Sequence, residues 1–123
     1  QDGSAGLGIQ SLEVLPADHE RRYMLRFVLV QAVVHSRKVT GEVKLQLEGM
    51  RDGQAASIPV SQLIPGDGRY DMGYEFRYFQ GLETEFELPV GFEPQRINVE
   101  IWPSEAKAEK VYQSFPWVVT SPG

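Results

Sequence analysis

Hydrophobic and polar residues alternate with a period of two through residues 74–102, and this stretch organises the chain. Successive side chains of a strand point to opposite faces of its sheet, so such alternation is typical of β-structure. The pattern predicts three strands here, over residues 74–78, 82–88 and 97–101. Between the first two strands lie residues 79–81, where the glycine is the expected turn or bulge residue.

Each of the first two strands is expected to carry a distinctive row of side chains. The first places three aromatic rings on one face: Tyr74, Phe76 and Tyr78. The second places three carboxylates on one solvated face: Glu83, Glu85 and Glu87. A helix would distribute these acids around its circumference, so the spacing favours a strand.

Five further strands are predicted by the same alternation, over residues 7–15, 19–34, 39–50, 55–60 and 111–119. In the first of these strands the alternation shifts by one residue near Ser11, a change called here a parity slip. The second is apolar on both faces in its second half, which is typical of a central strand covered on both sides. Asp52-Gly53 indicates a hairpin turn, and Pro116 marks the last strand as an edge strand or a bulged one.

Eight short strands separated by turn residues predict an all-β fold. We expect an immunoglobulin-like antiparallel β-sandwich of seven or eight strands, with a small barrel as the alternative. Residues 104–110 are the one helix-like stretch, with Ser104 as N-cap, but a long hairpin loop fits them equally. The fold would therefore contain at most one short helix. Residues 1–6 are expected to be a flexible linker, residues 7–120 a single domain, and residues 121–123 a tail.

Composition excludes several classes of site. The 123 residues suffice for one domain with its own core. The 17 acidic residues outnumber the 12 basic ones and give a net charge of −5, which argues against nucleic-acid and anionic-membrane partners. The chain has no cysteine, so disulfides, thiolate metal sites and thiol nucleophiles are excluded. No apolar run reaches the length of a membrane span, and membrane attachment is expected only through a segment outside this chain.

The residues that could carry catalysis or bind a metal are few. His19 and His35 lie at the two ends of one predicted strand, roughly 50 Å apart if it is extended, and are interpreted as surface histidines. Asp67 and Asp71 offer too few oxygens for a cation and are expected to cap turns. No Gly-x-Ser-x-Gly elbow or phosphate-binding glycine loop is present. We therefore predict no catalytic residue, no cofactor and no metal.

The candidate partner-binding residues come from the two rows described above: Tyr78, Phe79, Glu83, Glu85 and Glu87. The glutamate row is expected to be a solvated face, paired across strands with Arg22 and Arg26 or with Arg77, or else a docking stripe. Large aromatic residues usually build the core. The ones that could instead reach the surface are Tyr70, Tyr74, Tyr78, Phe79 and Trp102. An exposed aromatic patch would indicate protein or carbohydrate binding.

Two segments resemble a known protein family: F-R-Y-F-Q-G-L-E-T-E-F-E-L-P-V-G-F-E-P-Q-R-I-N-V-E-I-W from Phe76 to Trp102, and V-T-G-E-V-K-L-Q-L-E-G from Val39 to Gly49. The likeness, which extends from about Leu7 onward, is to uncharacterised proteobacterial inner-membrane proteins. In these a transmembrane helix and a coiled coil precede a C-terminal β-domain on the periplasmic side. The resemblance implies a periplasmic, membrane-anchored location and this architecture, and it brings no catalytic residues with it.

The sequence therefore favours a non-catalytic domain of the bacterial envelope that binds another protein or assembles with itself as a homodimer. The alternative is a module that binds carbohydrate or cell-wall glycan through exposed tyrosine and tryptophan. A hydrolase would need His19 or His35 within ~3 Å of an acid and a hydroxyl group in a pocket.

Overall fold

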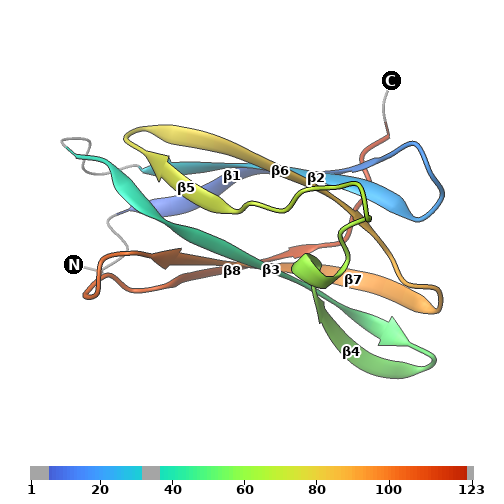
Figure 1. Cartoon of the computed structure of the whole chain (residues 1–123). Helices are drawn as coiled ribbons and strands as arrows, with labels where there is room; N and C mark the ends of the chain where they lie inside the picture. The colour runs from blue at the N-terminus through green and yellow to red at the C-terminus, as the bar shows by residue number, and fades with distance from the viewer. Residues whose placement is uncertain (1–5, 32–36, 122–123) are drawn as a thin grey trace.

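The computed structural model describes residues 6–31 and 37–121 as two packed antiparallel sheets (Figure 1). The elements are β1 (Leu7–Pro16), β2 (Arg22–Gln31), β3 (Val39–Arg51), β4 (Gln54–Pro59), a 3₁₀ turn η1 (Val60–Gln62), β5 (Gly73–Phe76), β6 (Phe79–Glu87), β7 (Phe92–Pro103) and β8 (Val111–Pro116). The small sheet has the order β1-β2-β6. The large sheet has the order β4-β3-β7-β8, and β5 also pairs with β3.

This strand order confirms the predicted immunoglobulin-like sandwich. Strands β1, β2 and β6 take the places of strands A, B and E, and β4, β3, β7 and β8 take those of C′, C, F and G. The chain crosses from one sheet to the other after β2, after β5 and after β6, and the apolar faces of the two sheets pack against each other.

The core consists of the inward-facing residues of both sheets. Along β3, Val43, Leu45 and Leu47 are buried while the residues between them are exposed, as the alternation predicts. The largest fully buried side chains come from four strands, β2, β3, β6 and β7: Leu25, Phe27, Leu29, Leu47, Phe86, Phe92, Ile97 and Ile101. Burying an aliphatic or aromatic side chain of this size contributes about 1.5–3 kcal/mol, so this core is the main source of stability.

Two local irregularities predicted from the sequence are confirmed. The register of β1 against β2 shifts between Gln10 and Glu13, where Ser11 has a φ of 61°. This is the parity slip, and it is a β-bulge. Asp52 and Gly53 have φ values of 51° and 84°, which a two-residue hairpin turn between β3 and β4 requires.

The prediction for residues 74–81 is wrong in detail. The first strand ends at Phe76, Tyr78 lies in a turn, and Gly81 lies inside β6. The turn is held by side chains that alternation does not reveal. The Gln80 side-chain oxygen accepts a hydrogen bond from the Glu75 backbone N–H at 2.8 Å, so the chain reverses before a longer strand forms.

Strand β2 is central in its sheet, as predicted, but only one of its faces is covered. Val28 and Val30 remain half-buried on the outer face, and no layer among the described residues packs over them. Residues 104–110 form the loop of a hairpin, with the Ala108 N–H donating to the Glu105 carbonyl at 3.1 Å. Across residues 6–31 and 37–121, no helix has the length and apolar character that crossing a membrane requires.

The segment after β8 closes one side of the sandwich. The Trp117 ring packs edge-on against Tyr23, with 5.1 Å between ring centroids, and lies beside Phe86. Farther on, Val119 forms a parallel bridge with Val14, whose carbonyl accepts the Thr120 N–H at 2.7 Å. The chain end thus ties the large sheet to β1.

Candidate functional site

The outer face of the small sheet carries the candidate residues, and its two ends differ in chemistry. At one end arginine and glutamate side chains alternate across β2 and β6; this charged row comprises Arg22, Arg26, Glu83, Glu85 and Glu87. The other end is apolar, and this apolar end comprises Val28, Val30 and Phe79. The register sets this division, because Arg22 lies opposite Glu87 and Val30 lies opposite Phe79.

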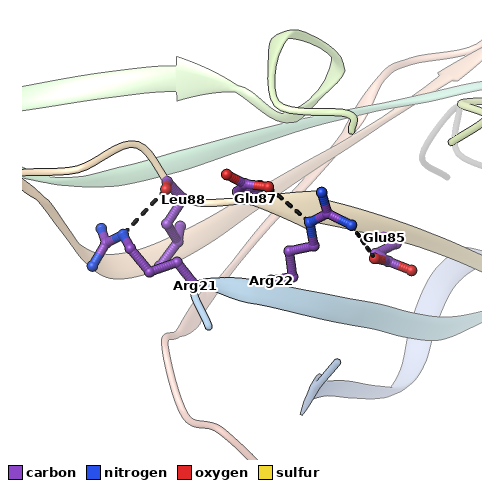
Figure 2. A network of polar contacts seen from close by, with 5 residues as sticks. All are labelled: Arg21, Arg22, Glu85, Glu87 and Leu88. Atoms are coloured by element: carbon purple, nitrogen blue, oxygen red, sulfur yellow. Dashed lines mark hydrogen bonds and ion pairs between the residues drawn. The ribbon is translucent and has the colours of Figure 1, made fainter. Parts of the chain in front are cut away.

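The charged row is internally paired, as one interpretation of the glutamate row predicted (Figure 2). Arg22 Nε lies 2.7 Å from Glu87 Oε1, and its Nη1 lies 3.9 Å from Glu85 Oε2. Arg26 Nε lies 3.1 Å from Glu83 Oε1. The hydrogen bond to Glu87 raises the pKa of Arg22 above its ordinary value. Exposed pairs of this kind contribute little to stability, so their effect is to orient the side chains and neutralise most of the row.

The apolar end is open to solvent. The Phe79 side chain is 69% exposed. Gly81 lies opposite Val28 on β6, and Gly8 lies opposite Val30 on β1. A Cβ added at either glycine would meet no atom within 4 Å. Each valine therefore has a position without a side chain on one neighbouring strand, and a partner could reach it from that side.

A shallow depression of about 400 Å³ continues from the apolar end toward the charged row. Val28 and Gly81 lie at one end of it, and its charged members are Glu13, Arg26 and Glu83. Because the lining is open rather than enclosed, it suits contact with a protein surface better than the burial of a small molecule.

The turn beside Phe79 is held in place by a buried glutamine. Gln31 is 3% exposed, and its side-chain amide donates to the Arg77 carbonyl at 2.7 Å. Its backbone N–H donates to the Tyr78 carbonyl at 3.1 Å. Tyr78, which is 57% exposed, thus sits on a fixed backbone. A surface that is ordered before binding loses less conformational freedom when a partner docks.

Arg21 anchors the opposite end of the small sheet, and sequence reasoning missed it. Its Nε donates to the Leu88 carbonyl at 3.2 Å (Figure 2). Its Nη2 donates to the carbonyls of Pro89 and Phe92. The Leu88 N–H returns a hydrogen bond to the Arg21 carbonyl. These bonds fix the connection between β6 and β7. Since backbone carbonyls are its partners, no acidic neighbour in the sequence could have revealed this role.

The residues considered for catalysis and metal binding have structural surroundings. His19 is exposed in the turn between β1 and β2, where its carbonyl accepts the Arg22 N–H at 3.1 Å; His35 lies outside the described residues. Asp71 accepts the Gly73 N–H at 3.0 Å and so caps a turn, as predicted. Asp67 lies in the neighbouring turn. Within the described parts of the chain, no three His, Asp or Glu side chains are grouped as metal ligands.

The remaining candidate aromatics are distributed between core and surface. Tyr74 is buried, and burial raises its pKa to about 12. Tyr70 is half-buried, and burial together with the nearby Glu42 raises its pKa as well. These two rings belong to the interior and its margin, so they cannot form a stacking platform for a sugar.

Trp102 is half-buried on the outer face of the large sheet, between two lysines. Lys44 Nζ lies 3.7 Å and Lys110 Nζ 3.6 Å from the ring centroid. Lys44 belongs to β3, and Lys110 immediately precedes β8. These strands flank β7 on opposite sides, so the two ammonium groups cover opposite faces of the ring. The indole N–H donates to Glu100 at 3.0 Å.

Comparison with known proteins assigns the chain to a family but does not indicate an activity. The model of a family of unknown function (DUF6776) matches residues 1–99. A search of curated proteins finds no match.

Proposed function

The chain belongs to this family of unknown function, and on that premise we propose that it is a non-catalytic domain that binds another protein. The surface proposed for this contact is the apolar end together with the adjoining charged row. The observation that carries the proposal is the exposure of Phe79 beside two accessible valines, on a sheet face that no described residue covers.

The chemistry of this surface is that of a protein interface. Aromatic side chains are enriched among the residues that dominate binding energy, and they function best inside a ring of polar groups that excludes water. Phe79 is such an aromatic residue, and the paired Arg26 and Glu83 provide a polar border two strand positions beyond Gly81. Because the charges are already paired, docking would not leave a lone charge buried.

We propose that the domain acts in the bacterial envelope, on the periplasmic side of the inner membrane, attached to it by a segment outside this chain. The support is the resemblance of residues 76–102 and 39–49 to a periplasmic β-domain. The absence of cysteine is compatible with an oxidising or a reducing compartment and does not bear on the location.

The glycan-binding alternative has less support. Sugar rings stack on open aromatic faces, yet Tyr74 is buried and both faces of Trp102 are covered by ammonium groups. Tyr112, which is 60% exposed, remains as the one accessible ring on that outer face within the described residues. A single ring provides weak recognition, so we favour a protein partner.

The proposal is tested by photo-cross-linking in cells that naturally make the protein. A photo-reactive amino acid replaces Phe79 in one variant of the full-length protein and Val90 in a control. Val90 is 86% exposed but lies alone on the loop between β6 and β7. We expect a discrete protein adduct from position 79 and none from position 90. Equal labelling at both positions, or no adduct at position 79, would overturn the proposal.

A further inference from the structure

The outer edge of β8 is unusual among the sheet edges of this domain. β8 ends the order of the large sheet, and no strand in the described part of the chain pairs with its outer side. Residues 111–115 read Val-Tyr-Gln-Ser-Phe and contain no charge. Edge strands usually carry charges, bulges or covering segments that prevent pairing with another chain.

The other sheet edges have such protection or offer little surface. β6 carries three glutamates, and its last backbone N–H, that of Glu87, donates to the Leu63 carbonyl. β1 is interrupted by the Ser11 bulge and partly covered by Val119. β4 is uncharged, but its exposed end consists of Gln-Ala-Ala-Ser, whose side chains have little apolar area. β8 is therefore the edge best suited to pair with a further strand.

The direction of the backbone groups on β8 follows from one hydrogen bond. The Trp117 N–H donates to the Gln95 carbonyl on β7 at 2.9 Å. Alternate residues of a strand direct their N–H and C=O groups to the same side. The backbone N–H and C=O groups therefore bond to β7 at residues 111, 113 and 115. They point outward, away from β7, at residues 110, 112, 114 and 116. Pro116 falls in the outward set, where its missing N–H removes no bond to β7.

We propose that two copies of the chain associate through antiparallel pairing of their β8 strands, with Gln113 opposite Gln113 about a two-fold axis. In this register Tyr112 of each copy exchanges two backbone hydrogen bonds with Ser114 of the other. The Lys110 N–H then meets the Pro116 carbonyl, the one group that residue 116 can offer. In this register the four outward residues 110, 112, 114 and 116 pair only with one another, and the two large sheets become continuous. Shifting the axis to Tyr112 would place Pro116 opposite residue 108, and shifting it to Ser114 would place Lys110 opposite residue 118.

The side chains are compatible with this register. Lys110 lies opposite Pro116, so no like charges face each other across the pair. On the outer face Tyr112, which is 60% exposed, lies opposite Ser114. On the inner face Val111 lies opposite Phe115, and both are half-buried in one copy, so pairing covers them further. This inference rests on the proposed function, because it names a second copy of the chain as one protein partner.

The first test compares the solution mass of three forms of the chain across a dilution series. Wild type should pass from twice the mass of one chain to the mass of one chain as it is diluted. Tyr112→Pro removes an outward N–H without touching a bond to β7, and should remain a monomer at every concentration. Tyr112→Thr keeps that N–H and should still dimerise. Thermal unfolding of both variants verifies that they are folded.

The second test does not depend on the proline variant. It determines which residues of the two β8 strands lie opposite each other. The chain has no cysteine, so a single introduced cysteine can form a disulfide only with the same residue of a second copy. Residues opposite each other in a non-hydrogen-bonded antiparallel pair have Cα atoms about 4.5 Å apart, within disulfide range. Gln113→Cys should therefore form a disulfide dimer on oxidation. Tyr112→Cys, whose counterpart lies diagonally across the pair about 7–8 Å away, should do so at least tenfold more slowly.

The outcomes separate this inference from the proposed function. A wild-type monomer at all concentrations, or equal cross-linking of the two cysteine variants, overturns pairing through β8. If the photo-cross-linker at Phe79 still yields an adduct with a different protein, the proposed function stands without it. If neither the dimer nor the adduct forms, both are wrong.

Discussion

Gly41 and Tyr74 face each other across β3 and β5, and the tyrosine ring occupies the space that a side chain at residue 41 would need. A Cβ at Gly41 would overlap the Trp102 carbonyl oxygen and lie 2.5 Å from the Tyr74 hydroxyl oxygen. An aromatic ring packed over a glycine on the neighbouring strand is a recognised device for fixing sheet register. The pair therefore positions β5, the strand from which the chain crosses to β6 and the apolar end.

This close approach predicts a large difference between two glycine substitutions. Gly41→Ala should lower the free energy of unfolding by about 3 kcal/mol or more, because strand backbone must move to admit the methyl group. Gly81→Ala should change it by less than about 0.5 kcal/mol, since no atom lies within 4 Å of the new Cβ. Denaturant unfolding measures both. Similar losses for the two variants would contradict the role assigned to the Gly41–Tyr74 pair.

The burial of Tyr74 also predicts that the folded protein loses stability at alkaline pH. Its hydroxyl is buried without a hydrogen-bond partner among the described residues, and burial raises its pKa to about 12. Below the ordinary tyrosine pKa of about 10 both the folded and unfolded states keep the proton. Between pH 10 and 12 the unfolded state loses it first, so stability falls as the pH rises, by roughly 2–3 kcal/mol in total.

Tyr74→Phe should remove the part of the alkaline loss that comes from residue 74 and leave the part that comes from Tyr70, whose pKa is also raised. Stability at neutral pH should be unchanged or higher by up to about 1 kcal/mol, because an unsatisfied hydroxyl is deleted. Tyr78→Phe is the matched control, since Tyr78 is exposed, and it should retain the loss. Urea unfolding from pH 7 to pH 12 provides the measurement. A parallel pH dependence for both variants would show that Tyr74 is not the group responsible.

Arg21 should matter more for stability than the arginines of the charged row. Arg21→Ala removes three hydrogen bonds to backbone carbonyls and should cost about 2–3 kcal/mol. Arg21→Gly should cost about 1 kcal/mol less, because glycine accepts the φ of 67° found there. Arg26→Ala, which breaks an exposed pair, is the control and should have a small effect. An equal loss from Arg21→Ala and Arg26→Ala would refute the anchoring role.

Salt should weaken the ion pairs of the charged row, but it should not weaken the binding of a partner to the apolar end. A double-mutant cycle on Arg22 and Glu87 measures their coupling directly. We expect a favourable coupling at low ionic strength that largely disappears in 1 M salt, because exposed charges are screened. The effect of Phe79→Ser on partner capture should persist in the same salt. Loss of partner capture by the wild-type chain in 1 M salt would assign the contact to the charges instead.

Alternation alone predicted most of the fold. The strands, the β1 bulge and the Asp52-Gly53 turn follow from side-chain parity and local backbone preference, which act over a few residues. The prediction failed at Tyr78, because the turn there depends on hydrogen bonds to side chains at Gln31 and Gln80. Gln31 is 46 positions from Arg77, whose carbonyl it binds, and no local pattern contains that information.

The candidate surface was predicted in part. Phe79 and the three glutamates were named, but the valines completing the apolar end were interpreted as covered, because the second half of residues 19–34 is apolar on both faces. A both-sided apolar strand is equally compatible with a layer packed over it and with an exposed patch. The three-dimensional structure distinguishes a covered strand from an exposed patch, because the placement of Gly8 and Gly81 leaves Val28 and Val30 uncovered.

The most direct measurement of the central claim is photo-cross-linking of the full-length protein in its own cells, with the reactive residue at Phe79, Tyr112 or Val90. The account predicts an adduct with a different protein from position 79, a product of twice the chain's mass from position 112, and no product from position 90. If positions 79 and 112 gave no more product than position 90, the domain would not be an interaction module built on these surfaces.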